Sequence, residues 1–308
     1  MRRFVVLVVA FALVPAAFAA GARERQTPGP LSAVAITGAE VSYADEYSTG
    51  CHEIRLWDIA DRSDRRLASH CFVGTSTGSG VAAVAAVAER ALWLTYTGGN
   101  IREWSLWTKR RGARVKRVAF VTADVDGPPP IVLGRTWESS LPYAIGRTVV
   151  ALAPNGSRRF TLTAPARVVT LTEHSRGYAA VLANGNVLTI SPEGKALREF
   201  PFARGVVEDA VLVAAGLVVK TPDGLEIHKG GSTRQIQLPL GSQFFGYSEG
   251  MVAYGTGRQL RLKLLRTGRD TLFRTLAPGF RAQLGRRGIA YTSGRTLGFT
   301  VWVFLTRA

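Results

Sequence analysis

Short strand-like segments follow one another along almost the whole chain. From residue 31 onward, short strand-like runs are either mostly apolar, as in residues 31–37 (LSAVAIT) and 91–96 (ALWLTY), or apolar at every second position, as in residues 259–264 (QLRLKL). This alternation places successive side chains on opposite faces of a β-strand. Gly, Asp, Asn or Pro stands between the runs, where a tight bend or a positive φ is needed. The pattern predicts an all-β chain of short antiparallel strands.

One unit of this pattern recurs seven times. Each unit contains a turn glycine that begins its third strand, and two strand-like runs precede that glycine. In the first six units a polar turn and a fourth strand follow. The glycines are 33 to 49 residues apart: Gly50, Gly99, Gly146, Gly185, Gly224, Gly257 and Gly294. Four short antiparallel strands per repeat of this length are typical of a propeller blade, so the sequence predicts a β-propeller of seven four-stranded blades.

This architecture resembles the WD40-like and TolB-like propeller superfamily over nearly all of the chain. Residues 56–58 (Leu-Trp-Asp) are similar to the WD dipeptide of a WD40 blade. The other repeats lack this dipeptide, and no Gly-His pair stands upstream of it. The resemblance therefore implies the fold and does not single out one family.

The sequence leaves open how the ring closes. The seventh unit ends soon after its third strand, at residues 302–306. Residues 21–30 look poorly suited to a strand, and residues 31–37 are needed for the first blade. Either a three-stranded blade closes the ring or the first blade is assigned wrongly. The predicted organisation is a signal peptide at 1–19, a short linker at 20–30 and the propeller at 31–308.

The N-terminus has the features of a secretory signal peptide. Arg2 and Arg3 precede an apolar run at residues 4–14, which Pro15 ends, and residues 17–19 (Ala-Phe-Ala) form an A-x-A cleavage pattern. The run is shorter than the roughly 20 residues that a membrane span needs, although an uncleaved anchor helix is the alternative. No later window is apolar enough to span a membrane. We therefore expect an exported chain, in the cell envelope or the extracellular space.

The two cysteines, Cys51 and Cys71, each have a histidine beside them, at His52 and His70. Zinc binding would need all four side chains, but neighbouring residues of a strand point to opposite faces. An even number of cysteines in an exported protein favours a disulfide instead. The two positions are nearly equidistant from the turn at residues 61–64, so a small bulge would bring them opposite each other. We predict a disulfide, and neither a metal nor a cofactor.

Charge gives the next indication of function. The chain has 39 Lys and Arg against 22 Asp and Glu, a net charge of +17, and its densest basic run is residues 108–117. Such a surface attracts anions. Aromatic residues near this run make a possible binding surface, which comprises Trp104, Trp107, Arg110, Arg111 and Trp137. The plainer interpretations are a solvated hairpin tip and aromatic packing between blades.

One motif could indicate catalysis. Residues 74–78 match G-x-S-x-G, with Ser76 as the nucleophile, but that motif requires a strand, a turn and a helix in an α/β sheet. In a chain of strands and turns the segment is better interpreted as an inter-blade loop.

Together these observations predict a secreted, non-enzymatic binding or scaffolding module. The expected partner is an envelope protein or an anionic polymer. Export and the scattered arginines argue against nucleic acid, and we expect a monomer. Two alternatives stay open: a propeller hydrolase or lyase with a site in the central channel, and a basic module that binds an anionic glycan or lipid.

Overall fold

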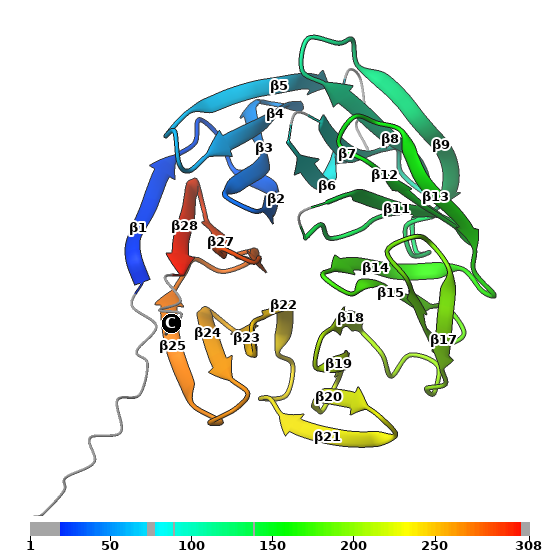
Figure 1. Cartoon of the computed structure of the whole chain (residues 1–308). Coiled ribbons are helices and arrows are strands. Elements are labelled where there is room, and N and C mark those ends of the chain that lie inside the picture. The colour runs from blue at the N-terminus through cyan, green and yellow to red at the C-terminus, as the bar shows by residue number, and fades with distance from the viewer. Residues whose placement is uncertain (1–18, 73–77, 89, 138, 303–308) are drawn as a thin grey trace, which may run out of the picture.

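The computed structural model describes residues 19–72, 78–88, 90–137 and 139–302. Within these residues the chain forms seven four-stranded antiparallel sheets, arranged as blades around a central axis (Figure 1). The predicted seven-bladed β-propeller is confirmed. Most of the predicted signal peptide and the serine of the G-x-S-x-G motif, Ser76, lie outside the described residues.

The blades follow one another in chain order. Blade 1 contains β2 (Leu31–Thr37), β3 (Glu40–Ser48), β4 (Cys51–Asp58) and β5 (Asp64–Cys71). Blade 2 contains β6 (Ser79–Val87), β7 (Arg90–Thr97), β8 (Ile101–Arg110) and β9 (Lys116–Asp124). Blade 3 contains β10 (Ile131–Leu133), β11 (Leu141–Ile145), β12 (Thr148–Leu152) and β13 (Arg158–Thr163). Blade 4 contains β14 (Val168–His174), β15 (Gly177–Leu182), β16 (Val187–Ile190) and β17 (Ala196–Phe200). Blade 5 contains β18 (Asp209–Val213), β19 (Gly216–Thr221), β20 (Gly224–Lys229) and β21 (Ser232–Gln237). Blade 6 contains β22 (Gln243–Ser248), β23 (Met251–Thr256), β24 (Gln259–Leu264) and β25 (Asp270–Thr275). Blade 7 contains β26 (Ala282–Leu284), β27 (Gly288–Ser293), β28 (Thr296–Trp302) and, as its outer strand, β1 (Ala19–Gln26).

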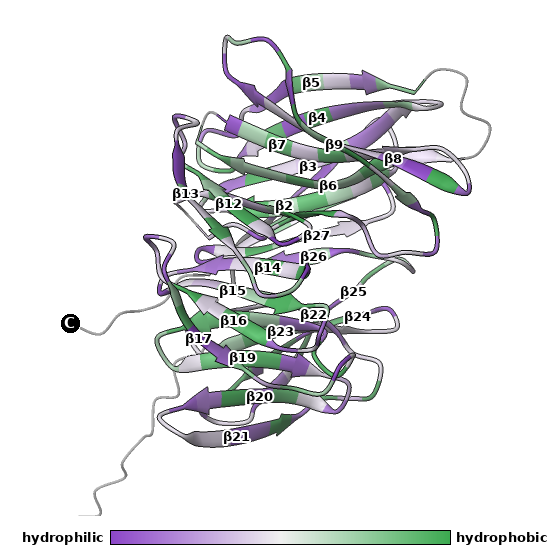
Figure 2. Cartoon of the chain, turned by 90° about the vertical axis from the view of Figure 1, so that its right-hand side faces the viewer, coloured by the Kyte–Doolittle hydropathy of each residue, from purple (hydrophilic) through white to green (hydrophobic). Residues whose placement is uncertain are grey.

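The core lies between neighbouring blades. The second strand of each blade is buried on both faces, whereas outer strands such as β17 and β21 are largely exposed (Figure 2). Between blades 1 and 2, for example, fully buried Trp93 packs with Ile54 and Leu56. A single four-stranded sheet cannot cover both of its faces, so each blade depends on its two neighbours for burial.

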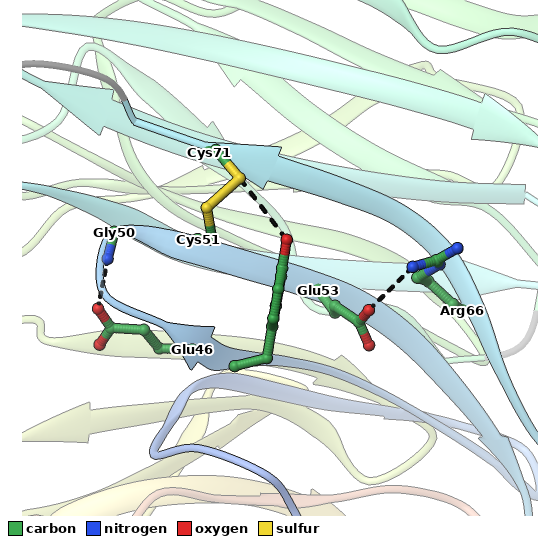
Figure 3. Close-up of a disulfide and its surroundings, with 7 residues drawn as sticks. Glu46, Gly50, Cys51, Glu53, Arg66 and Cys71 are labelled. Atoms are coloured by element: carbon green, nitrogen blue, oxygen red, sulfur yellow. Dashed lines mark hydrogen bonds and ion pairs between the residues drawn. A yellow bond between two sulfur atoms is a disulfide. The ribbon is translucent and has the colours of Figure 1, made fainter.

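The predicted disulfide is present in blade 1. Cys51 and Cys71 lie directly opposite each other in the β4–β5 pair, and a register shift between Ile54 and Arg55 supplies the expected bulge. Around it, Glu46 accepts a hydrogen bond from the Gly50 backbone nitrogen at 2.9 Å, and Arg66 pairs with Glu53 at 3.1 Å (Figure 3). The disulfide joins the open end of the outer hairpin of the blade.

We expect the substitution Cys51→Ala to lower the stability by about 3 kcal/mol, because the disulfide closes a loop with a sequence separation of 20 residues. Thermal unfolding of the oxidised wild type, the reduced wild type and the double variant Cys51→Ala/Cys71→Ala measures this loss. All reduced or substituted forms should melt together at a lower temperature. An unchanged melting temperature would show that the disulfide is not needed to hold the hairpin.

The closure of the ring corrects the sequence analysis. Residues 21–26, which looked poorly suited to a strand and were assigned to a linker, belong to β1, which pairs antiparallel with β28. The N-terminal strand therefore completes blade 7 as its outer strand, and the last blade is not three-stranded. The assignment of residues 31–37 to blade 1 is confirmed. The first and the last segments of the chain thus lie in one sheet (Figure 1).

Charged residues of β1 connect this strand to its neighbours. Arg25 reaches blade 1, where its guanidinium lies 2.7 Å from the Asp64 carboxylate. The same carboxylate pairs with Arg55 at 2.8 Å and accepts a hydrogen bond from the buried Tyr43 hydroxyl at 3.1 Å. On the other side, Glu24 accepts a hydrogen bond from the Tyr291 hydroxyl at 2.7 Å. The polar residues that made this segment look like a linker therefore have specific partners in the closed ring.

The contribution of the Arg25 contact can be isolated by comparing two aspartates. Asp270 in blade 6 also pairs with a tyrosine and an arginine of its own blade, and more distantly with Lys263 at 3.9 Å, but among the described residues it has no partner from β1. We expect Asp64→Asn to destabilise the protein by about 1 kcal/mol more than Asp270→Asn, because it also weakens a partly buried ion pair across the closure. Chemical unfolding of both variants, each alone and combined with Arg25→Gln, tests this. If the two aspartate variants lose equal stability, and if Arg25→Gln lowers the stability of each by the same additional amount, the Arg25–Asp64 pair does not stabilise closure.

Candidate functional site

The first strands of the blades surround a central channel. A hollow of about 260 Å³ lies in this channel, and its walls come mainly from blades 1, 2, 6 and 7. Small and apolar side chains dominate the walls: Ala33, Val34, Ala35, Ala82, Ala83, Val84, Leu133, Phe244 and Phe245. The polar side chains of the hollow are Arg135, Gln243, Arg281 and Gln283, and a second group of polar residues lies where blade 3 meets blade 4.

Blade 3 differs from the other blades at its first connection. Its first strand, β10, has three residues, and the chain then crosses to blade 4, where Arg135 forms a parallel bridge with Thr172. The crossing brings the backbone close to its neighbours, since a Cβ on Gly134 would lie 3.0 Å from the Leu171 carbonyl oxygen and 2.9 Å from the Pro142 ring. Glycine permits this approach because it has no side chain.

Residues 134–137, named here the crossing segment, close one end of the channel. Arg135 pairs with Asp209 of blade 5 at 2.6 Å, and its guanidinium lies 5.4 Å from the centre of the Phe244 ring of blade 6. Thr136 is buried and its hydroxyl lies 2.5 Å from that of Thr37 of blade 1. Because blades 1, 4, 5 and 6 lie around the axis, a segment that contacts all four must extend over the channel (Figure 1).

A buried carboxylate fixes the chain that follows the crossing segment. Glu173 is 3% exposed and accepts hydrogen bonds from the Trp137 backbone nitrogen at 2.9 Å and from the hydroxyls of Ser139 and Ser140 at 2.6 and 2.8 Å. The Ser140 hydroxyl also lies 2.9 Å from that of Tyr178. Hydrogen bonds to a charged acceptor are stronger than those between neutral groups, so this carboxylate holds the connection in one conformation.

His174 and Trp137 form the surface beside this connection. Their ring centres are 3.8 Å apart, and His174 is 8% exposed. Burial lowers the pKa of His174 to about 4, so the imidazole is neutral at neutral pH. A cleft of about 400 Å³ adjoins it, lined also by Arg159, Glu249 and Arg286. The closed end of the ring therefore presents a concave, polar surface.

The pKa of His174 predicts a pH dependence. In the unfolded chain this imidazole gains a proton near pH 6.5, but in the folded chain only near pH 4, so stability is retained above pH 6.5 and lost as the pH falls toward 4. Chemical unfolding measures the free energy of unfolding at pH 7 and at pH 4.5. The decrease between the two pH values should be about 2 kcal/mol smaller in His174→Gln than in the wild type. Equal losses in the two proteins would show that His174 does not titrate in this way.

Four of the five residues of the predicted surface lie on one hairpin, and the fifth lies elsewhere. Trp104 and Trp107 belong to β8, Arg110 ends that strand, and Arg111 begins the turn to β9. The fifth, Trp137, lies at the end of the crossing segment.

The two tryptophans of β8 point to opposite faces of blade 2. Trp104 is buried and packs with Tyr96 in the core shared with blade 3. Trp107 packs toward blade 1, where its ring centre is 5.4 Å from that of His70, and its indole nitrogen donates to the Thr95 hydroxyl at 3.0 Å. Both tryptophans therefore lie where the plainer interpretation places them, packed between neighbouring blades. The arginines, in contrast, are exposed.

Within the described chain, the hairpin of β8 and β9 has the longest strands of any hairpin, with ten and nine residues (Figures 1 and 2). Residues 109–117, named here the basic tip, contain six basic residues and no acidic one: Lys109, Arg110, Arg111, Arg114, Lys116 and Arg117. Three large apolar side chains of the same hairpin are exposed: Ile101 by 63%, Val115 by 41% and Phe120 by 45%. The guanidinium of Arg117 lies 5.0 Å from the centre of the Phe120 ring. The surface combines positive charge with exposed apolar area.

Sequence reasoning did not identify the polar residues of the closed channel end. In this region the sequence pointed only to Trp137, and Glu173 was not considered. A signal was present, since the other blades join their first two strands by short turns whereas seven residues separate β10 from β11. No local pattern, however, shows which carboxylate receives the donors of such a connection.

Two further observations concern the described part of the chain alone. Residues 19–72, 78–88, 90–137 and 139–302 contain no helix long and apolar enough to cross a membrane. In the same residues no three side chains of His, Cys, Asp or Glu gather in a way that could hold a metal ion.

Comparison with known proteins supports the fold. No described protein family and no curated protein matches the sequence. Among solved structures, Raptor of Chaetomium thermophilum is similar with a TM-score of 0.53 at 14% identity, over 93% of this chain and 29% of Raptor. The computationally designed Ika8 protein has a TM-score of 0.51 at 12% identity, over 90% of this chain and 98% of Ika8. Sqt1 of Saccharomyces cerevisiae has a TM-score of 0.50 at 11% identity, over 94% of this chain and 100% of Sqt1.

These likenesses concern the fold, which is the seven-bladed β-propeller described above. This chain spans about 29% of the length of Raptor. At such low identities the comparisons bear on the fold alone, and a fold does not by itself determine a function.

Proposed function

We propose that the chain is an exported binding module of the cell envelope or the extracellular space, which engages an acidic partner through the hairpin of β8 and β9. The observation that carries this proposal is the basic tip, with its six basic residues in nine positions and exposed apolar side chains beside it. Positive charge of this density attracts an anionic partner, and exposed apolar surface adds contact area once the partner is bound.

Three features support the location outside the cytoplasm. The N-terminus has the pattern of a cleaved signal peptide, and the disulfide between Cys51 and Cys71 requires an oxidising compartment. Cleavage after Ala19 would also leave residues 20–26, and with them nearly all of β1, on the mature chain. N-terminal sequencing of the protein recovered from outside the cytoplasm tests this, and a mature N-terminus beyond Gln26 would contradict it because that chain could not close its ring.

Neutralising the basic tip tests the proposed contact. We expect the triple variant Arg110→Gln/Arg114→Gln/Lys116→Gln to bind immobilised poly-glutamate roughly tenfold more weakly at low salt, since three exposed ion pairs of about 0.5 kcal/mol each would be lost. The matched control, Arg176→Gln/Arg204→Gln/Arg266→Gln, removes the same charge from exposed positions of other blades and should change the affinity less than twofold.

The salt dependence separates a local contact from general attraction. The wild type and the control should lose affinity steeply as the salt concentration rises, and the tip variant should lose less. Equal weakening of the two triple variants would contradict a dedicated surface, since the net charge alone would then explain the binding.

A further inference from the structure

We infer that the outer edge of β9 accepts a β-strand from an acidic partner protein, so that the partner adds a fifth strand to blade 2. This inference deepens the proposed function, on which its charge argument rests, by naming the mode of contact and the class of partner. It begins from a property of the edge itself, which the charge of the basic tip does not explain.

The edge of β9 carries charges only at its two ends, and a bulge at Val118 is the one irregularity in its pairing with β8. In its blade β9 pairs only with β8, so the backbone groups on its other side face outward. Residues 118–123 (Val-Ala-Phe-Val-Thr-Ala) form six consecutive uncharged positions without proline. Exposed edges usually carry charges, prolines or bulges because a flat, uncharged edge pairs with other chains.

The outer strands of the other blades carry charged residues at shorter intervals. Examples are Arg198 and Glu199 in β17, Arg234 in β21, and Asp270 and Arg274 in β25. The longest uncharged run among them has five residues, in β5, and it ends at the disulfide cysteine Cys71. β9 is therefore both the longest outer strand and the one with the longest uncharged run.

The side chains of β9 are suited to an added strand. Val118, Phe120, Val121 and Thr122 all have high β-propensity. On one face, Ala119, Val121 and Ala123 pack against the core shared with blade 3 and keep the strand in place. On the other face, Phe120 and Thr122 are exposed. A partner strand would pair with a rigid template and cover the Phe120 ring.

Charge complementarity selects the partner. The basic tip includes the first two residues of β9, so one end of an added strand would lie beside up to six positive charges. A second copy of this chain fits poorly, because antiparallel pairing of two β9 edges would offer the six positive charges of each basic tip only Glu103, Asp124 and Asp126 as nearby acids. We therefore assign the edge to an extended segment of another protein, with a stretch of β-forming residues followed by acidic residues.

Two peptides of equal charge test strand addition. The first has six alternating valine and threonine residues followed by four glutamates, and the second has its two central residues, one valine and one threonine, replaced by proline. We expect the first to bind at least tenfold more tightly, because the N–H groups of two successive residues point to opposite sides of a strand, so one of the two prolines must remove a donor that faces β9. Hydrogen exchange should slow at residues 118–123 when the first peptide binds. Equal affinities, or no added protection at these residues, would overturn the inference.

A variant that protects the edge separates pairing from charge attraction. Phe120→Lys/Thr122→Lys, both at exposed positions, adds positive charge while giving the edge the protection seen in other blades. It should reduce binding of the first peptide to the level of the proline peptide, and binding of poly-glutamate should stay the same or strengthen. The single variant Thr122→Lys is the control for misfolding, and its melting temperature should equal that of the wild type.

The remaining outcomes distinguish the two proposals. If poly-glutamate binding depends on the basic tip but the two peptides bind equally, strand addition is wrong and the proposed function stands. If the peptides differ but neutralising the tip has no effect on poly-glutamate, the proposed charge contact fails. A dimer in sedimentation that the double lysine variant dissociates would assign the edge to a second copy. Tighter binding of that variant to vesicles with 30% anionic lipid, without peptide binding, would assign the surface to a membrane.

Discussion

The pairing of β1 with β28 is the contact on which the rest of the ring depends. Every blade buries its faces against two neighbours, so an open ring would expose both the last blade and the first. The N-terminal strand prevents this by completing the sheet of the C-terminal strands. Its contacts have the largest sequence separations among the described residues, so the ring closes only when the two ends of the described chain meet. Arg25 and Glu24 then hold the strand on both sides, through Asp64 and Tyr291.

Closure of the channel has a consequence for where a partner can bind. The crossing segment contacts blades 1, 4, 5 and 6, and Glu173 fixes the chain that follows it. The side chains of this segment therefore connect blades across the axis, and the nearby hollow has mainly apolar walls. The exposed chemistry of the described chain lies elsewhere, with the cleft beside His174 at this end and the basic tip on the rim. A large partner can reach the rim without any rearrangement of the ring.

The sequence predicted those features that local patterns determine. Alternating apolar residues and turn glycines repeat within each blade, so seven blades and the register of Cys51 with Cys71 could be predicted. The strand β1 was missed because its sequence, with Arg23, Glu24 and Arg25, has no apolar alternation of its own. Its charges are satisfied by residues that lie far away in the sequence, such as Asp64 and Arg274. The crossing segment was missed for the same reason, since the partners of Arg135 and Thr136 belong to other blades.

The edge of β9 differs from these cases because its local sequence conflicts with its place in the fold. Buried strands are expected to be uncharged, and outer strands of a soluble ring are expected to carry charges that prevent association. The middle of β9, residues 118–123, is uncharged like an inner strand although it occupies an outer position, and core packing in blade 2 accounts only for Val118, Ala119, Val121 and Ala123. Phe120 contributes exposed apolar area and no core packing, and it lies beside Arg117. Conflicts of this kind between local sequence and global fold tend to mark functional positions, because selection for stability and solubility alone would remove them.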